Sequence, residues 1–405
     1  MAGSYSKEEQ KKILKERTVS TDELRSSLSY VRQERERVRK RNTVIALCAG
    51  AAVILAVCVY LWLRFSRYTT YEVESELKTG GLANAVIEPF DGGCVVIGAD
   101  ALTFVKDDKV VWTGSVKLTD PVFASEGAYF AVCGKGGYQA YVCDRSGILS
   151  TVKVSRHIRK MDISENGVLC VFTEADDAAY ISFFDRFGTK TQAEVKTLIS
   201  ATGYPMDIAV SPDGNRLIAV YYSTENGIGE SRLVCYDFES GKSADNYIAA
   251  SFDDYDDSDT LLVDADFFTD DEAYVIGDHS VTFLKSEKKE IRRTVTETGD
   301  RVLAVFRAGS RLGLIREENG ANVCLFYDRN GKEGRTFEAP QTFDRVLADN
   351  ALVWFFDRGN VQIRNVTGEL RYEGELSDRP LSVCLAGRRS LILNTGAELL
   401  RLTYK

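Results

Sequence analysis

The sequence has 405 residues, of which 60 are acidic and 51 basic, so its formal net charge is −9. Residues 1–42 hold twelve Lys or Arg against seven acids, and with Arg64 and Arg67 also set aside, residues 68–405 carry −16. This charge repels nucleic acid and anionic lipid, so we expect no nucleic-acid partner. The length allows one large all-β domain plus a tail.

Residues 1–42 predict a basic helical tail. Residues 20–23, Ser-Thr-Asp-Glu, fit a capping box, and Leu24, Leu28 and Val31 follow on one narrow apolar seam. A helix that leads into the next segment is therefore predicted. Most of its other faces are charged, so pairing of the seam with a cytoplasmic partner stays a hypothesis.

The next segment, residues 43–63, begins at Thr43, ends at Leu63 and contains no charged side chain. At ~1.5 Å per helical residue it is ~30 Å long, which matches a bilayer core, so we predict a transmembrane helix in contact with membrane lipid. A cleaved signal peptide would need a short basic region and a small-residue cleavage site. A lipoprotein signal would need a small residue before Cys48, where Leu47 stands. A buried helix of a soluble protein would need further helices around it.

Basic residues are densest just before this segment, which places the N-terminus in the cytoplasm by the positive-inside rule. The predicted domains are a cytoplasmic tail (1–42), a transmembrane helix (43–63), a linker (64–70) and an extracytoplasmic domain (71–405). We therefore expect a single-pass protein of the cell membrane whose large domain lies in the cell envelope.

The large domain contains a repeated β-hairpin in which an acidic or polar residue and glycine end a strand. Asp or Asn beside Gly supplies the positive φ angles of a short hairpin turn. A second turn precedes each hairpin, so the unit is four strands, A to D, with tight A–B and C–D turns, repeated at roughly forty residues. The hairpins are YVCDRSG (141–147), ISFFDRFG (181–188), LVCYDFESG (233–241), VCLFYDRNG (323–331) and IRNVTG (363–368).

Eight such units predict an all-β fold, an eight-bladed β-propeller, with seven blades as the alternative. The last unit ends after three strands, and an open ring would expose an unpaired edge, which natural sheets avoid. Residues 71–79 have strand character, so we expect them to complete the last blade. The A strands should begin near Ala83, Asp120, His157, Gly203, Leu261, Arg301, Phe343 and Pro380.

This closure places residue 71 on the face that carries the A–B and C–D turns, the tight-turn face. Residues 64–70 reach at most ~24 Å when extended, so this face should look toward the membrane. The opposite face, here called the distal face, collects the B–C and D–A connections. The two longest insertions, 223–231 and 242–260, fall there, and loops on a rigid scaffold often bind partners. The candidate binding residues are Thr224, Glu225, Asn226, Glu230, Asp253, Asp254, Tyr255, Asp256 and Asp257. The alternative is that both insertions are merely tolerated.

The Ser-Pro-Asp-Gly turn at 211–214 and the Asp-Arg-x-Gly hairpins resemble those of WD40-like, TolB-like and quinoprotein-like propellers. The whole layout resembles a bacterial family of membrane-anchored propeller proteins of unknown function. The resemblance covers residues 71–405 and implies an architecture but no activity. The chain lacks the Gly-His and Trp-Asp pairs of true WD40 repeats, and Trp112 and Trp354 are too few for blades that bind a quinone, so no cofactor is expected.

Little in the sequence indicates catalysis. The two histidines, His157 and His279, fall at a strand start and after a strand, and HExxH, CxxC, P-loop and GxSxG motifs are absent. The acidic run 252–259 lacks the Gly and Glu that an EF-hand loop needs, so a solvated loop is expected and no metal site is assigned. We therefore assign no catalytic, cofactor or metal residue.

Seven of the nine cysteines lie in the large domain, all in apolar strand-like runs where a free thiol packs as a small hydrophobe. Only Cys133 and Cys143, on either side of one turn, suggest a disulfide, and strands out of register would rule it out.

Three functions are compatible with the sequence. The first is a non-catalytic binding or scaffolding protein that recognises a protein, peptide or glycan outside the cell. The second is an envelope sensor that signals through the cytoplasmic tail. The third is a propeller hydrolase or lyase, which would require buried carboxylates of raised pKa near the central channel.

Overall fold

The computed structural model describes residues 7–12, 15, 37, 39–58, 60, 67–225, 228–238, 247–253, 261–287, 290–299, 301–387 and 389–405. The chain divides into two compact units, Met1–Ser66 and Arg67–Lys405. In the first unit Arg39–Cys58 forms a helix that is long and apolar enough to cross a membrane. The predicted capping box at 20–23 and the end of the predicted span, 61–63, lie outside the described residues.

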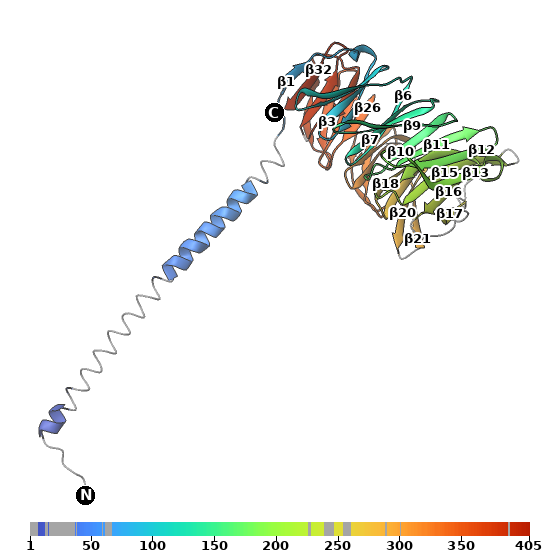
Figure 1. Ribbon diagram of the computed structural model, residues 1–405. Coiled ribbons are helices and arrows are strands. Elements are labelled where there is room, and N and C mark those ends of the chain that lie inside the picture. The colour runs from blue at the N-terminus through green and yellow to red at the C-terminus, as the bar shows by residue number, and fades with distance from the viewer. Residues whose placement is uncertain are drawn as a thin grey trace, which may run out of the picture. The chain divides into compact units, whose positions relative to one another are not determined.

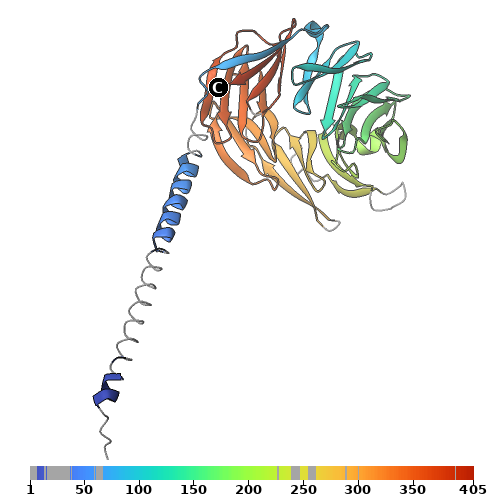
Figure 2. The ribbon, with the colours of Figure 1, turned by 60° about the vertical axis from the view of Figure 1, so that its left-hand side comes forward.

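The second unit is a propeller of eight four-stranded antiparallel sheets (Figures 1 and 2). Alternating apolar residues form these strands because one set of side chains faces each neighbouring blade. The eight A strands are β2 (Val86–Phe90), β6 (Pro121–Glu126), β10 (Ile158–Ile163), β14 (Tyr204–Val210), β18 (Leu262–Thr269), β22 (Val302–Ala308), β26 (Arg345–Ala348) and β30 (Ser382–Leu385). Described A strands of adjacent blades contact one another, as β14 and β18 do.

The B and C strands form the middle of each blade. The B strands are β3 (Gly93–Ile97), β7 (Tyr129–Gly134), β11 (Leu169–Ala175), β15 (Arg216–Glu225), β19 (Glu272–Gly277), β23 (Arg311–Glu318), β27 (Leu352–Asp357) and β31 (Ser390–Asn394). The C strands are β4 (Ala101–Lys106), β8 (Gln139–Asp144), β12 (Ala178–Phe184), β16 (Ile228–Asp237), β20 (Ser280–Glu287), β24 (Ala321–Tyr327), β28 (Asn360–Asn365) and β32 (Leu399–Tyr404).

The D strands lie at the outer edge of the blades. They are β5 (Lys109–Ser115), β9 (Gly147–Lys153), β13 (Lys190–Leu198), β17 (Ile248–Phe252), β21 (Glu290–Glu297), β25 (Glu333–Glu338), β29 (Leu370–Glu375) and, for blade 8, β1 (Tyr71–Leu77). Two short helices, η1 (Leu82–Asn84) and α2 (Ile199–Thr202), lie in connections between blades. All eight A strands begin within three residues of their predicted starts, so the eight-bladed prediction is confirmed and the seven-bladed alternative is wrong.

The ring closes as predicted, because β1 pairs antiparallel with β32 and completes the last blade. The register places Tyr71 opposite Tyr404 and Leu77 opposite Leu399. Tyr71 also packs on the rings of Tyr372 and Tyr404, with centroids 6.5 and 5.9 Å away, and its hydroxyl accepts the Ser377 N–H at 2.8 Å. The first strand of the domain is therefore bound to both blade 7 and blade 8.

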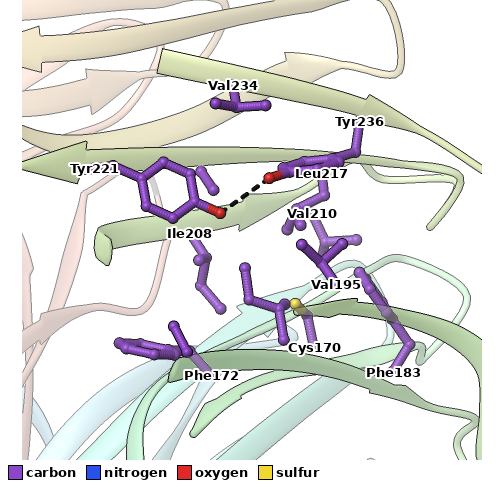
Figure 3. Packing of buried hydrophobic residues seen from close by; sticks show 13 residues of the cluster. Cys170, Phe172, Phe183, Val195, Ile208, Val210, Leu217, Tyr221, Val234 and Tyr236 are labelled. Atoms are coloured by element: carbon purple, nitrogen blue, oxygen red, sulfur yellow. Dashed lines mark hydrogen bonds between the residues drawn. The ribbon is translucent and has the colours of Figure 1, made fainter. Parts of the chain in front are cut away.

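The hydrophobic core lies between neighbouring blades. Between blades 3 and 4 the buried side chains include Phe172 and Phe183 from one sheet and Tyr221 and Tyr236 from the other (Figure 3). The two tyrosine hydroxyls hydrogen-bond at 3.0 Å, which satisfies both polar groups inside the cluster. Burial of one such aromatic side chain contributes about 1.5–3 kcal/mol.

Blade 4 differs from the prediction in two places. Strands β15 and β16 have ten residues each and continue beyond the sheet as a hairpin toward the distal face, so Thr224, Glu225 and Glu230 lie in strands rather than in a loop. The segment 242–260, expected to be one connection, contains the D strand β17. The short run Ile-Ala-Ala-Ser-Phe was missed because polar residues surround it on both sides.

The disulfide left open between Cys133 and Cys143 is ruled out. In the pairing of β7 with β8, Cys133 lies opposite Ala140 and Cys143 lies opposite Phe130, so the two thiols are out of register. Both are free, as are the other five cysteines of the propeller, and all seven are buried as predicted. Burial raises the pKa of the Cys133 thiol to about 12, so it packs as a neutral side chain.

The Asp-Arg-x-Gly hairpins at 144–147, 185–188 and 328–331 share one side-chain hydrogen bond, although the backbone of Gly147, with φ 147°, differs from that of the other two glycines. The Asp144, Asp185 and Asp328 carboxylates each accept the N–H of the residue two positions on, at 2.7–2.9 Å. Gly188 and Gly331 take φ angles of 82° and 79°, which glycine adopts without steric cost. The motif therefore fixes the C–D turn.

The arginine of each motif reaches the preceding blade. Arg186 Nη1 donates to the Tyr129 hydroxyl at 2.9 Å, and Arg329 Nη1 donates to the Glu272 carboxylate at 3.1 Å. Arg145 lies 3.9 Å from Asp91 in a weaker, more exposed pair. The repeated arginines therefore connect successive blades on the tight-turn face.

Candidate functional site

Two adjoining cavities lie on the distal face between blades 6 and 7, with volumes of 890 and 270 Å³. They share Thr342, Asp357 and Asn360, and we call them together the distal groove. The remaining lining comes from Leu303, Glu317, Gly320, Asn322, Gln341, Phe343, Asp344 and Arg358 in the larger cavity, and from Pro340, Phe355, Phe356, Val361, Gln362, Glu373, Gly374 and Glu375 in the smaller one.

The walls of the groove come from the B–C turn of blade 6, the connection from β25 to β26, and the B–C turn of blade 7. The buried Asn322 amide donates to the Pro340 and Gln341 carbonyls at 2.8 and 3.0 Å, which fixes this connection against blade 6. Thr342 Oγ1 donates to Asp357 Oδ2 at 2.6 Å and fixes the other side of the connection to blade 7. The groove is therefore held open by its own hydrogen bonds.

Arg358 has an unusual backbone for a long side chain, with φ 50°. This left-handed conformation costs roughly 1 kcal/mol for a non-glycine residue. The Arg358 N–H donates to Asp344 Oδ2 at 3.0 Å, and Gly359 follows it in the tight turn. Arg358 is exposed and lines the larger cavity.

The distal groove is acidic. Five carboxylates line its walls, those of Glu317, Asp344, Asp357, Glu373 and Glu375, against the single cation Arg358. A concave surface lined by one sign of charge concentrates ions of the opposite sign. The groove therefore favours a cationic ligand over an anionic one.

The described candidate residues from the sequence lie elsewhere. Thr224 and Glu230 are exposed on the long hairpin of blade 4, and Asp253 is exposed directly after β17. Glu225 pairs with Ile228 at the end of the same hairpin. Asn226 and the residues Asp254, Tyr255, Asp256 and Asp257 lie outside the described residues. None of Thr224, Glu225, Glu230 and Asp253 lines the distal groove, so their role in binding stays a prediction.

A second concentration of charge lies on the A strands of blades 3 to 6. It consists of Lys160, Asp162, Asp207, Asp264, Asp266 and Arg307, here called the inner-strand cluster. Four successive A strands have a register shift at the same place, just before Lys160, Asp207, Asp264 and Ala304. A bulge re-aims the side chains that follow it, and its repetition brings these residues together.

Asp207 is the centre of the inner-strand cluster and is buried. Its Oδ1 accepts the Lys160 Nζ of blade 3 at 2.9 Å, and its Oδ2 accepts the Ala265 N–H of blade 5 at 3.0 Å. Asp162 repeats the arrangement, because its Oδ2 accepts the Val210 N–H of blade 4 at 2.7 Å. Each carboxylate thus joins its own blade to the next.

Asp266, on the A strand of blade 5, makes the corresponding contact with blade 6. Its Oδ2 accepts the Tyr274 hydroxyl at 3.1 Å and the Arg307 Nη1 at 3.4 Å, and Arg307 Nη2 donates to the Phe268 carbonyl. Burial raises the pKa of the Asp266 carboxyl, while the Arg307 guanidinium acts in the opposite direction.

Two carboxyl groups of the cluster have pKa values near or above neutrality. Burial raises the pKa of Asp162 to about 8, although the Val210 N–H that it accepts favours the charged form. Burial and the Asp207 carboxylate raise the pKa of Asp264 to about 7. Asp264 is an exposed residue, yet protein atoms surround much of its carboxyl group. The acidic groups that the hydrolase hypothesis requires are present, yet Asp162, Asp207 and Asp266 are committed to bonds within and between blades.

The closed ring of eight four-stranded blades defines this protein as an eight-bladed β-propeller. The chain belongs to DUF5711, a family of unknown function, whose model matches residues 64–401. The family and fold expected from the sequence are thereby confirmed. No curated protein matches the sequence closely enough to be counted.

Solved structures share the fold at low identity. BamB from Moraxella catarrhalis is 11% identical with a TM-score of 0.51, covering 83% of this chain and 100% of its own. Apo AztD from Citrobacter koseri is 11% identical with a TM-score of 0.50, covering 74% of this chain and 88% of its own. The Dos1 propeller is 12% identical with a TM-score of 0.51, covering 84% and 95%. At such identities the likeness shows the fold alone.

Proposed function

We propose that this protein is a non-catalytic binding module of the cell envelope that recognises a basic, extended peptide segment of a partner protein in the distal groove. The observation that carries the proposal is the groove itself, a polar cavity of 890 Å³ with a smaller extension, built on rigid blades. Ligand sites are typically preformed concavities of this size with a few placed polar groups.

The charge of the groove supports a basic peptide. Its walls carry five carboxylates and one guanidinium, and the propeller as a whole is strongly acidic. A Lys or Arg side chain of the partner would pair with the Glu317 carboxylate, and Arg358 would pair with a carboxylate or carbonyl oxygen of the same segment. A neutral glycan could donate hydroxyl hydrogen bonds to these carboxylates but would form no ion pair with them.

The proposal includes the orientation expected from the sequence, with the N-terminus in the cytoplasm and the propeller outside. It is supported by the apolar helix Arg39–Cys58 and by the basic residues before it. Tyr71 lies at the C–D end of blade 8, opposite Tyr404, so the chain enters the propeller on the tight-turn face. A short connection to the membrane would leave the distal face free for partners.

The test compares peptide binding by wild-type protein and two charge reversals. We expect purified protein to bind Lys- and Arg-containing peptides from an array, and Glu317→Lys to weaken that binding by about tenfold, since a like charge would then face the ligand. Glu333→Lys, at the opposite end of blade 6, should leave binding unchanged. Equal binding of acidic peptides or of glycans would overturn the groove assignment. Labelled peptide bound to intact cells tests the orientation separately, because it requires the propeller outside.

A further inference from the structure

We propose that the inner-strand cluster is a proton-controlled latch, in which protons held among its four aspartates keep blades 3 to 6 together and proton release loosens this sector of the ring. The latch is independent of the distal groove, which lies between blades 6 and 7 and is lined by other residues.

The charges of the cluster balance only when two protons are bound. Four carboxyl groups, those of Asp162, Asp207, Asp264 and Asp266, face two cations, Lys160 and Arg307. With a proton on Asp162 and one on Asp264, two carboxylates pair with two cations and the net charge is zero. Without those protons the same space holds two uncompensated negative charges, which is unfavourable in a partly dehydrated site.

Asp264 is the group through which the latch opens. It lies beside Asp207, and in its protonated form its carboxyl would donate a hydrogen bond to that carboxylate. When the proton leaves, two carboxylates meet where one hydrogen bond had joined them. Because Asp207 also holds Lys160 and the Ala265 N–H, repulsion there strains the contacts of three successive blades.

The groups that face the latch from the surrounding strands do not replace the lost protons. On the blade 2 side, burial raises the pKa of Glu126, and the negative charges of Asp266 and Glu165 act in the same direction while Arg307 opposes them. On β11 and β19, burial raises the pKa of Cys170 and of Tyr274, so both stay neutral. The two cations of the cluster, Lys160 and Arg307, already form ion pairs with Asp207 and Asp266. Deprotonation therefore leaves a net repulsion between the strands.

The direction of the pH effect follows from the raised pKa values. A carboxyl group that binds its proton more tightly in the folded state stabilises the fold most at low pH, and this stabilisation is lost as pH rises through the folded pKa. For Asp264 and Asp162 this window extends up to about 7 and about 8. An increase of external pH from mildly acidic to mildly alkaline should thus loosen blades 3 to 6.

The experiment uses the full chain in detergent or nanodiscs. We expect carbon-13 carboxyl signals of the wild type to titrate with midpoints close to pH 7 and 8, and protection factors of the Val210 and Ala265 amides to fall by at least about tenfold from pH 6 to pH 9. Asp264→Asn can still donate a hydrogen bond to Asp207 but carries no charge, so this variant should show a smaller fall than the wild type, and the rest of the fall should come from Asp162. Asp176→Asn, the same change in an exposed turn of blade 3, should behave as wild type.

Two results would overturn the latch. One is the absence of any carboxyl titration in the wild type between about pH 6 and pH 9. The other is a fall of protection in Asp264→Asn as large as in the wild type. The carboxyl titration is measured on the unaltered chain, so it decides the matter even if the variant does not fold.

Discussion

Asn394 shows how one buried polar residue helps to close the ring. Its side chain is fully buried, and its Nδ2 donates to the Leu82 and Ala85 carbonyls at 3.0 and 2.9 Å, while its Oδ1 accepts the Gly396 N–H at 2.8 Å. These bonds join the B strand of blade 8 to the segment that leads into blade 1. Buried backbone groups need such partners because they have lost water.

Replacement of this residue should therefore be costly. Asn394→Ala takes this partner from the Ala85 carbonyl and the Gly396 N–H, while the Leu82 carbonyl keeps only the Ala85 N–H. We expect the free energy of unfolding to fall by about 2–4 kcal/mol. Urea denaturation of the two proteins measures the difference. Asn360→Ala removes an exposed amide in the distal groove and should change stability by less than about 0.5 kcal/mol. Similar losses for both variants would show that the Asn394 bonds contribute little.

At the scale of single residues, the sequence could predict burial but not partners. All seven propeller cysteines are buried as expected, because apolar neighbours on a strand indicate an inward side chain. The carboxylates of the inner-strand cluster escaped prediction. Asp162, Asp207 and Asp264 lie on different strands about fifty residues apart in sequence, and only the repeated bulges bring them together.

At the scale of the element, the C–D hairpins were predictable because Asp and Gly have local preferences for turns. What the arginine of the motif contacts was not predictable, since Tyr129 and Glu272 belong to the preceding blade. The distal groove was missed for the same reason. Its walls include Asn322, Thr342 and Arg358, which come from three separate segments of the chain. None of these segments is unusually long, so loop length gave no reason to select them.

Two glycines of blade 6, one in its C–D turn and one in its B–C turn, provide a matched test of packing between blades. Gly331 and Gly320 have the same φ, 79°, but a Cβ on Gly331 would lie 2.6 Å from Phe283 Cδ2, whereas a Cβ on Gly320 would meet nothing within 4 Å. We expect Gly320→Ala to destabilise by about 1 kcal/mol through backbone strain alone. Gly331→Ala should lose about 2–4 kcal/mol, because blade 6 must also move away from blade 5.

Thermal or urea unfolding of the two variants gives this comparison directly. The difference between them removes the backbone term, which is common to both, and leaves the steric term. If the two variants were equally stable, contact between the C–D turn of blade 6 and Phe283 would not constrain the ring. A larger loss at Gly331 would show that the turn is packed against its neighbour as the structure has it.

At the scale of the whole molecule, the number of blades and the closing strand could be derived from the sequence because both follow from one rule, that sheet edges are paired. The last unit has three strands and one extra strand stands at the start of the domain, so only one arrangement pairs every edge: the extra strand must complete the last blade. The register of Tyr71 with Tyr404 confirms it. A closed ring couples its two ends, which lie more than three hundred residues apart in sequence.

This closure predicts a large effect for a small truncation. A chain that begins at residue 67 keeps β1, whereas one that begins at residue 79 loses it, and both lack the apolar helix Arg39–Cys58. Loss of β1 exposes the edge of β32 and removes the contacts of the Tyr71 ring with Tyr372 and Tyr404. The shorter chain should unfold at a midpoint at least about 10 °C lower and should associate through the free edge.

Differential scanning calorimetry gives the midpoints, and size-exclusion chromatography gives the state of association. Because both chains start after the helix, a difference between them comes from β1 and not from removal of the apolar segment. A monomeric shorter chain with an unchanged midpoint would mean that blade 8 is stable with three strands. The bonds of Asn394 to the segment before blade 1 would then be the contact that holds the ring closed.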